Sequence, residues 1–222
     1  MPTKAEKMRS LFEAGEKKPQ STMSFEEAKQ RAEGCQLCRL KDSRTRVVFG
    51  EGSLKAQLFF IGEAPGEVED AQARPFVGPA GQKLTEILAA AGIKREEVYI
   101  SNVVKCRPPQ NRTPLKDEME TCFPYLEAQI NHIKPKIIVT LGNVPTQLLL
   151  GTTEGINNLR GKFFKWKDNI EIFPMFHPSY LLRNPSKEKG SPKYLTWQDI
   201  QKVKERLDEL RQSHGSGTDA ES

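Results

Sequence analysis

The chain has 222 residues and a formal net charge of +5, and this length suits one α/β domain with short extensions. No apolar run approaches the roughly 20 residues that span a bilayer. The N-terminal stretch MPTKAEKMRS also lacks the apolar core of a secretory signal. These features argue against a membrane-spanning or secreted protein and predict a cytoplasmic one, which we expect to be a monomer.

The positive charge is concentrated in three stretches. Residues 99–116 and 160–167 each hold four Lys or Arg and no acid, and residues 39–46 hold four beside the single acid Asp42. Clusters of this kind are typical of proteins that bind a polyanion. A solvated surface gives the same pattern, so charge alone leaves both interpretations open.

The two ends of the chain differ from its middle. Residues 1–24 are rich in Lys and Glu and predict a flexible N-terminal extension, while residues 212–222 have the composition of a disordered tail. We therefore expect a single domain over residues 25–211.

The first predicted element is a helix over residues 24–33, with Ser24 as its N-cap and Glu27 completing a capping box. Beyond it, apolar runs alternate with helical patterns. The predicted strands cover residues 57–61, 98–104, 136–141, 161–167 and 170–176, and the predicted helices cover residues 81–92, 115–133, 143–150 and 193–211. Asp168-Asn169 between the last two strands predicts a hairpin. This alternation predicts a mostly parallel sheet covered by helices on both faces.

Polar segments follow three of these strands, at residues 62–70, 102–111 and 177–183. In a parallel sheet, functional sites lie beyond the carboxyl ends of the strands, where such segments meet. The first segment, GEAPGEVED, places four carboxylates within nine residues of a positively charged chain. We expect this acidic segment to form part of the site.

The four cysteines are Cys35, Cys38, Cys106 and Cys122, with the spacing C-x2-C followed much later by C-x15-C. A cytoplasmic chain is not expected to keep them as disulfides. Four thiolates suit either a tetrahedral zinc ion or an iron–sulfur cluster, and the spacing does not separate the two. A redox-active dithiol at CQLC, residues 35–38, is an alternative that requires free thiols.

Four segments together resemble the family 4 uracil-DNA glycosylases, the iron–sulfur branch of that superfamily. They are GEAPGEVED at 62–70, RPFVGPAG at 74–81, NVVKCRPPQNRTP at 102–114 and HPSYLLR at 177–183. The resemblance implies one three-layer α/β/α domain with a central, mostly parallel four-stranded sheet. It also implies a structural [4Fe–4S] cluster on the four cysteines.

The activity implied by the resemblance is base excision repair. The enzyme would hydrolyse the N-glycosidic bond of uracil in double- or single-stranded DNA and leave an abasic site. A second hypothesis is a non-catalytic iron–sulfur protein of the same fold that binds nucleic acid without turnover.

A glycosylase must flip its target nucleotide out of the stack and read the edge of the base. The amide of Asn102 can donate and accept hydrogen bonds at such an edge, and Phe76 can stack on the base. Without the resemblance, an Asn that closes a turn and a Phe in the core are the alternatives. Gly62 and Glu63 complete the expected substrate-binding set.

Catalysis requires stabilisation of a leaving uracil anion and of a cationic sugar. His177 can donate a hydrogen bond to uracil O2, although a histidine that caps a strand end is the alternative. Carboxylates favour the oxocarbenium-like sugar, and the resemblance points to Glu63 and Glu69 as the inward pair. Asn111 is a second candidate for positioning the attacking water.

The other two acids of this segment, Glu67 and Asp70, are expected to be solvated. In the best-known branch of the superfamily, an Asp stands at the position that Ala64 occupies here. The resemblance therefore leaves the residue that positions the water open.

The segment from Pro178 to Arg183 resembles a loop that enters the DNA minor groove. A wedge residue there would fill the gap left by the flipped base, whereas the first turn of a helix with leucines in the core is the alternative. The expected DNA-binding residues are Tyr180, Leu181, Leu182, Arg183, Arg107 and Arg112.

Overall fold

The computed structural model describes residues 23–215. Most of the expected N-terminal extension and C-terminal tail, residues 1–22 and 216–222, lie outside the described residues. The helices are α2 (Phe25–Glu33), α3 (Glu67–Gln72), α4 (Pro79–Ala90), α5 (Lys116–Ile133), α6 (Asn143–Leu150), α7 (Ile156–Leu159), α8 (Pro178–Arg183) and α9 (Pro192–Gly215). Short 3-10 helices cover Arg39–Asp42, Arg95–Glu97, Pro109–Asn111 and Lys167–Asn169. Within the described range, no helix is both long and apolar enough to cross a membrane.

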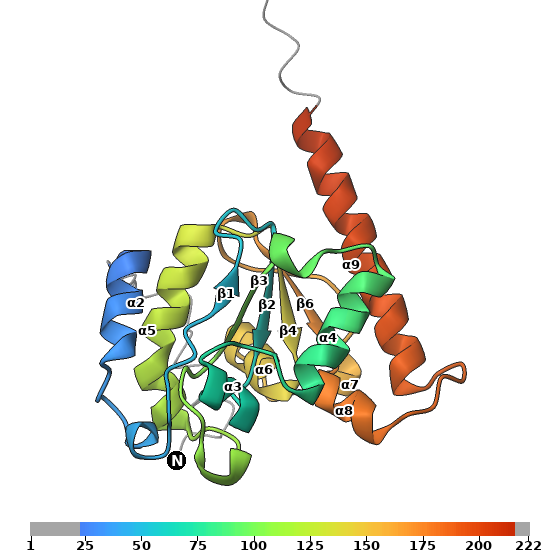
Figure 1. The fold of residues 1–222 in the computed structure, drawn as a ribbon. Helices are drawn as coiled ribbons and strands as arrows, with labels where there is room; N and C mark the ends of the chain where they lie inside the picture. The colour runs from blue at the N-terminus through green and yellow to red at the C-terminus, as the bar shows by residue number, and fades with distance from the viewer. Residues whose placement is uncertain (1–22, 216–222) are drawn as a thin grey trace, which may run out of the picture.

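The centre of the fold is one mixed sheet with the strand order β1-β3-β2-β4-β6-β5 (Figure 1). Its strands are β1 (Glu51–Gly52), β2 (Leu58–Gly62), β3 (Tyr99–Asn102), β4 (Ile137–Leu141), β5 (Phe164–Lys165) and β6 (Glu171–Met175). The four inner strands β3, β2, β4 and β6 are parallel, as expected. A short antiparallel strand at each edge brings the sheet to six strands rather than the four that the resemblance implied.

The two edge strands have different sequence signals. The hairpin between β5 and β6 is confirmed, and Asp168 and Asn169 take the left-handed backbone that its turn requires. The pairing of β1 depends on Gly52, because a Cβ there would lie 1.9 Å from the carbonyl oxygen of Val98. Such a two-residue contact leaves no periodic pattern in the sequence.

Two apolar cores lie on opposite faces of the sheet. α2, α5 and α6 pack on one face, and α4 and α9 pack on the other (Figure 1). β2, β3 and β4 are buried along their whole length, and β6 is buried beyond Glu171, because helices cover both faces of the sheet. This is the predicted α/β/α arrangement, and it brings the carboxyl ends of all four inner strands to one edge.

Helix α2 begins as expected, with the Ser24 hydroxyl accepting a hydrogen bond from the Glu27 backbone N–H. The predicted strand over residues 98–104 is shorter, because pairing stops at Asn102. The chain then turns, and the backbone N–H of Val103 donates to the Gly62 carbonyl. This early end places Asn102 at the edge of the sheet where the polar segments gather.

Candidate active site

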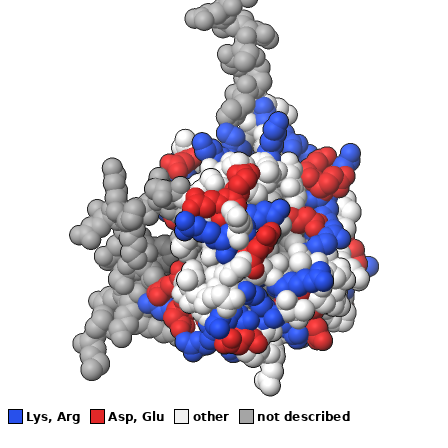
Figure 2. All heavy atoms as spheres, turned by 60° about the vertical axis from the view of Figure 1, so that its left-hand side comes forward, with Lys and Arg blue, Asp and Glu red and all other residues white. Residues whose placement is uncertain are grey.

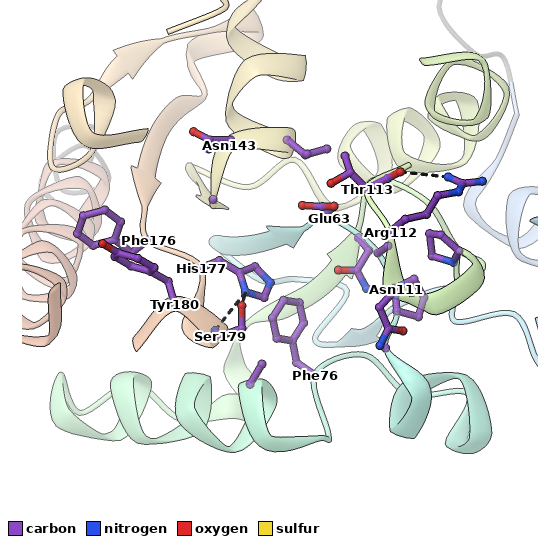
Figure 3. Close-up of a pocket in the computed structure, with 18 of the residues that line it drawn as sticks. Glu63, Phe76, Asn111, Arg112, Thr113, Asn143, Phe176, His177, Ser179 and Tyr180 are labelled. Carbon is purple, nitrogen blue, oxygen red and sulfur yellow. Dashed lines mark hydrogen bonds between the residues drawn. The ribbon is translucent and has the colours of Figure 1, made fainter. Parts of the chain in front are cut away.

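A cavity of about 770 Å³ opens beyond the carboxyl ends of the inner strands (Figure 3). Its volume lies within the range of sites for small organic ligands. The structure brings nine of the residues singled out from the sequence to its walls. They are Glu63, Glu69, Phe76, Asn102, Asn111, Arg112, His177, Tyr180 and Arg183.

Asn102 offers an unused hydrogen-bond acceptor to this cavity. The residue is 1% exposed, and its Oδ1 is the buried side-chain atom that lacks a hydrogen-bond partner among the described residues. Buried polar atoms in native proteins are nearly always paired, so an unpaired one in a cavity wall indicates a bound donor. The side chain is held against Gly62, where a Cβ would lie 2.4 Å from Oδ1. Gly62 therefore does not line the cavity but makes room for Asn102.

Phe76 presents its ring beside that amide, although the residue is buried. A Cβ on Gly62 would also lie 2.5 Å from the Phe76 ring, and the ring centroid is 5.8 Å from that of His177. The backbone of Phe76 is left-handed, with φ of 52°, which is costly for an aromatic residue. The surrounding loop must therefore be held firmly.

Glu69 supplies part of that hold. Its Oε1 accepts hydrogen bonds from the backbone N–H groups of Val77 and Gly78, at 2.9 and 2.7 Å. Arg95 binds the same loop from outside, through the Pro75 carbonyl at 2.7 Å. One carboxylate oxygen of Glu69 thus positions the loop that carries Phe76, a role that the sequence analysis did not assign to it.

His177 is the N-cap of α8, and its ring is fixed in one tautomer. The backbone N–H of Ser179 donates to Nδ1 at 3.2 Å, and the Ser179 hydroxyl lies 2.8 Å from the same atom. Because Nδ1 accepts, a neutral ring carries its proton on Nε2. Burial, followed by the charge of Arg183, lowers the pKa of His177 to about 4. The sequence left its charge open, and the structure supports a neutral imidazole that donates from Nε2.

Glu63 follows β2 directly and lies near Thr113 on the cavity wall (Figure 3). Burial raises the pKa of Glu63 above its usual range, and a hydrogen bond with Thr113 partly opposes that shift. A carboxylate with a raised pKa is a better proton acceptor than a solvated one. Glu63 is therefore the acid of this segment whose surroundings best suit a general base.

The remaining two acids of GEAPGEVED differ from each other. Glu67 is exposed, as expected, and pairs with Arg107 at 3.3 Å. The expectation that Asp70 is solvated is wrong, because the residue is 2% exposed. Its carboxylate accepts from the backbone N–H groups of Thr45 and Arg46, at 2.8 and 3.3 Å. Asp70 thereby ties α3 to the loop that follows the first cysteine pair.

The basic residues near the cavity are mostly committed to protein partners. Both terminal nitrogens of Arg112 bond to the buried Glu118, at 2.8 and 2.6 Å, although Arg112 was expected to bind DNA. Arg107 donates to Asn111 Oδ1 at 2.8 Å, which leaves one further acceptor position on this oxygen. Arg183 is exposed and lines the cavity. On the face seen in Figure 2, basic and acidic side chains are interspersed.

Helix α8 carries the three side chains that are candidates for the wedge, which are Tyr180, Leu181 and Leu182. Leu181 is only 1% exposed and packs beneath the helix, so the structure corrects its candidacy as a wedge. Leu182 is 45% exposed, and Tyr180 lies on the cavity wall with its ring 5.1 Å from that of Phe176. The helical alternative therefore holds for Leu181, while Leu182 is the exposed aliphatic side chain.

Sequence reasoning missed several residues of the site. Ser179, Thr113 and Asn143 line the cavity, the first two as partners of His177 and Glu63. Histidine is not among the usual N-cap residues, so its contact with Ser179 has no strong sequence signal. Asn143 accepts from the Ile156 backbone N–H at 2.7 Å, and no local pattern signals that contact.

The four cysteines converge on a second, smaller cavity behind β3. Cys35 and Cys38 reach it from the turn after α2, Cys106 from the loop after β3, and Cys122 from α5. Two of the sulfurs receive N–H donors. Arg44 donates to Cys106 Sγ and the Lys105 backbone N–H donates to Cys122 Sγ, each at 3.3 Å. Among the described residues, no three His, Cys, Asp or Glu side chains are arranged to hold a single metal ion.

This cavity fits a group held by several thiolates better than a reactive dithiol. Four sulfurs line one space, and N–H donors aimed at sulfur are the usual surroundings of thiolate ligands. Burial raises the pKa of Cys38 and Cys106, and raises that of Cys122 to about 12. Redox-active thiols need a lowered pKa, so the surroundings do not favour the thiol redox alternative.

Comparison with known proteins gives one family. Residues 49–201 match the model of the uracil DNA glycosylase superfamily. That range contains all four inner strands, the loop of Phe76 and the residues that line the cavity.

Individual relatives agree with this match. The chain is 47% identical to a type-4 uracil-DNA glycosylase of Thermotoga maritima, over 79% of this chain and 90% of the relative. It is 44% identical to a type-4 enzyme of Sulfurisphaera tokodaii, over 82% and 84% of the two chains. It is 46% identical to one of Saccharolobus solfataricus, over 78% and 82%.

Proposed function

The chain belongs to the uracil-DNA glycosylase superfamily, and from this premise we propose that it excises uracil from DNA in the cavity beyond β2, β3, β4 and β6. It is an enzyme of the type-4 branch and acts in DNA repair by hydrolysing an N-glycosidic bond. The observation that carries the site assignment is the unpaired Oδ1 of Asn102 in the cavity wall.

Uracil presents a donor at N3 between two carbonyl oxygens, and Asn102 has the complementary groups. Its Oδ1 accepts from N3–H, its Nδ2 donates to O4, and Phe76 stacks on the base. This edge is paired inside the duplex and becomes accessible only when the nucleotide is flipped out, so a flipped uracil would satisfy the orphaned oxygen.

His177 acts on the other side of the base. As the bond between uracil N1 and the sugar C1′ breaks, negative charge gathers on uracil O2. A neutral imidazole that donates from Nε2 stabilises this charge without needing a proton from solvent. The contacts of Ser179 with Nδ1 support this role, since they hold the required tautomer before substrate binds.

The sugar becomes cationic in the same step, and the acidic residues act there. Glu63 accepts a proton from the water that adds to C1′, and its raised pKa supports this assignment. Glu69 keeps the Phe76 loop in place through Oε1, while its charge favours the sugar cation. Asn111 remains a second candidate for positioning the water, because its Oδ1 keeps one acceptor position beside the bond from Arg107.

DNA would lie across the cavity mouth, with Arg183 on a phosphate and Leu182 or Tyr180 in the gap left by the base. Both single and double strands are compatible with a cavity that takes one flipped nucleotide. Behind the site, the four cysteines would hold a [4Fe–4S] cluster. The cluster would join three segments of the chain and would have a structural role, not a role in bond cleavage.

A uracil-release assay on an oligonucleotide with a single deoxyuridine tests the proposal. The wild type should release uracil, and alkali should then cleave the strand at the abasic site. Asn102→Ala should lose about 10²–10³-fold in the rate of uracil release, by analogy with the loss of a transition-state hydrogen bond. The matching thymine oligonucleotide should remain intact. Folded wild-type protein that leaves the deoxyuridine strand uncut would refute the function.

A further inference from the structure

Lys105 is a buried lysine that the proposed chemistry does not use. It is 1% exposed and lies between the two cavities, where it lines the cysteine cavity and follows Asn102 by three residues. Its Nζ donates to Ser101 Oγ at 2.6 Å, to the Asn102 carbonyl at 2.8 Å and to Gln129 Oε1 at 2.7 Å. No carboxylate is among these three partners.

The three partners can only accept from Lys105. The Asn102 oxygen is a carbonyl, the Ser101 hydroxyl donates to the Phe49 carbonyl at 2.7 Å, and the Gln129 amide donates to that same carbonyl at 2.8 Å. An ammonium group has three donors and no acceptor, and here each donor has one partner. The three donors of a protonated Nζ are therefore all used within the protein.

The same residue is also fixed at its backbone. Its N–H donates to Cys122 Sγ, and Cys106 is the next residue in the chain. Lys105 thus connects the cysteine cavity, through its backbone, to the end of β3, through its side chain. A buried ammonium without a carboxylate partner is costly, and nearby thiolates are the available negative charge.

We propose that Lys105 is a positioning residue for base recognition, which holds the end of β3 so that the Asn102 amide meets the uracil edge. This inference rests on the proposed function. The tolerance at Asn102 is small, because its Oδ1 already packs against the Gly62 backbone. Reading a base edge requires placement within about 0.5 Å, so a loosened strand end weakens recognition before it unfolds the domain.

The test measures recognition without catalysis. We would compare the Kd for a duplex with 2′-fluoro-2′-deoxyuridine, which resists cleavage, with the Kd for the same duplex containing thymidine. The Kd for the thymidine duplex divided by the Kd for the fluorinated duplex measures how well the protein recognises the base.

Lys105→Met keeps the unbranched stem and deletes the donors. It should reduce the ratio about tenfold, while iron content and the Kd for the thymidine duplex stay at the wild-type values. Lys55→Met, at an exposed loop lysine, is the matched control and should change none of the three.

The outcomes separate this inference from the function itself. A folded Lys105→Met protein with wild-type iron content and an unchanged ratio would overturn the positioning role. If Lys105→Met does not fold, Ser101→Ala and Gln129→Met each remove one acceptor, and an unchanged ratio in both would overturn it equally. A wild type that does not prefer the fluorinated uracil duplex refutes the proposed function, and the inference falls with it.

Discussion

The two cavities flank the same loop, yet they treat polar groups in opposite ways. In the large cavity, Asn102 Oδ1 stays unpaired and His177 keeps a free donor at Nε2. Around the cysteine cavity, Lys105 uses all three donors, and Cys106 and Cys122 each accept from an N–H group. Unmet hydrogen-bonding capacity indicates where a transient ligand binds, and saturated groups indicate where the protein must remain rigid. Substitutions of the groups that face the large cavity should therefore cost rate, substitutions of the cysteines should cost stability, and Lys105→Met should weaken recognition of the base.

The largest effect is expected at the cysteines. Cys122→Ser keeps the size of the side chain but replaces a proposed thiolate ligand by a buried hydroxyl, so the protein should contain little iron. Loss of the link between α5, the loop after β3 and the turn after α2 should lower the thermal midpoint by about 10 °C. At this chain length about 2–4 °C corresponds to 1 kcal/mol. Iron analysis and thermal unfolding by circular dichroism check both results.

The neighbouring Thr121→Ser on α5 is the control for Cys122→Ser. It should keep wild-type iron content and nearly the same thermal midpoint. Full iron content in Cys122→Ser would contradict the assignment of this residue as a ligand.

The second effect is on rate alone. His177→Ala removes the donor at uracil O2, and the rate of uracil release should fall by about 10²–10³-fold. The thermal midpoint should change far less than in Cys122→Ser, which single-turnover kinetics and calorimetry would establish. His132→Ala, near the end of α5 where the ring contacts Phe25 of α2 and does not line the large cavity, should keep the wild-type rate. A variant that loses stability and rate in parallel would remove the distinction between the two cavities.

The third effect concerns pH, and its sign follows from the lowered pKa of His177. Between pH 6.5 and about 4 the unfolded chain binds a proton at this ring that the folded chain does not. Unfolding free energy should therefore fall as pH falls through this window, by up to about 3 kcal/mol from this group. Guanidinium unfolding of the wild type and of His177→Gln at pH 7 and pH 4.5 isolates the contribution of His177 to this loss of unfolding free energy. Equal losses in the two proteins would show that the ring is not held neutral.

The sequence predicted the scaffold because the parallel strands and amphipathic helices carry strong periodic patterns. The runs at 57–61 and 136–141 are continuous apolar stretches, and the structure places them as β2 and β4 within one residue. The two-residue strand β1 was not predictable, since it depends on backbone packing at Gly52 rather than on side-chain alternation. Short contacts between distant segments have no local signal.

The site was predictable as a set of segments but not as a set of contacts. Because functional sites lie beyond the carboxyl ends of parallel strands, the sequence alone predicted that Asn102, Glu63 and His177 lie close together. It did not predict that Asp70 is buried or that Arg112 is held by Glu118, because both depend on partners distant from the strand ends or on local folding of a loop. A charged residue in a sequence cannot be assigned to a ligand or to a protein partner until that partner is known.

The smallest effect lies at the rim of the large cavity, where two adjacent leucines in α8 face different surroundings. Leu182 is exposed, and Leu182→Ala should lower excision from duplex DNA about tenfold while single strands are processed normally, because only a duplex must be held open after flipping. Leu181 is buried, and Leu181→Ala should instead cost about 2–5 kcal/mol of stability and affect both substrates alike. Excision kinetics on matched single- and double-stranded oligonucleotides, with unfolding curves for both variants, separate the roles. Equal losses on both substrates for Leu182→Ala would mean that α8 supports the cavity without entering the DNA.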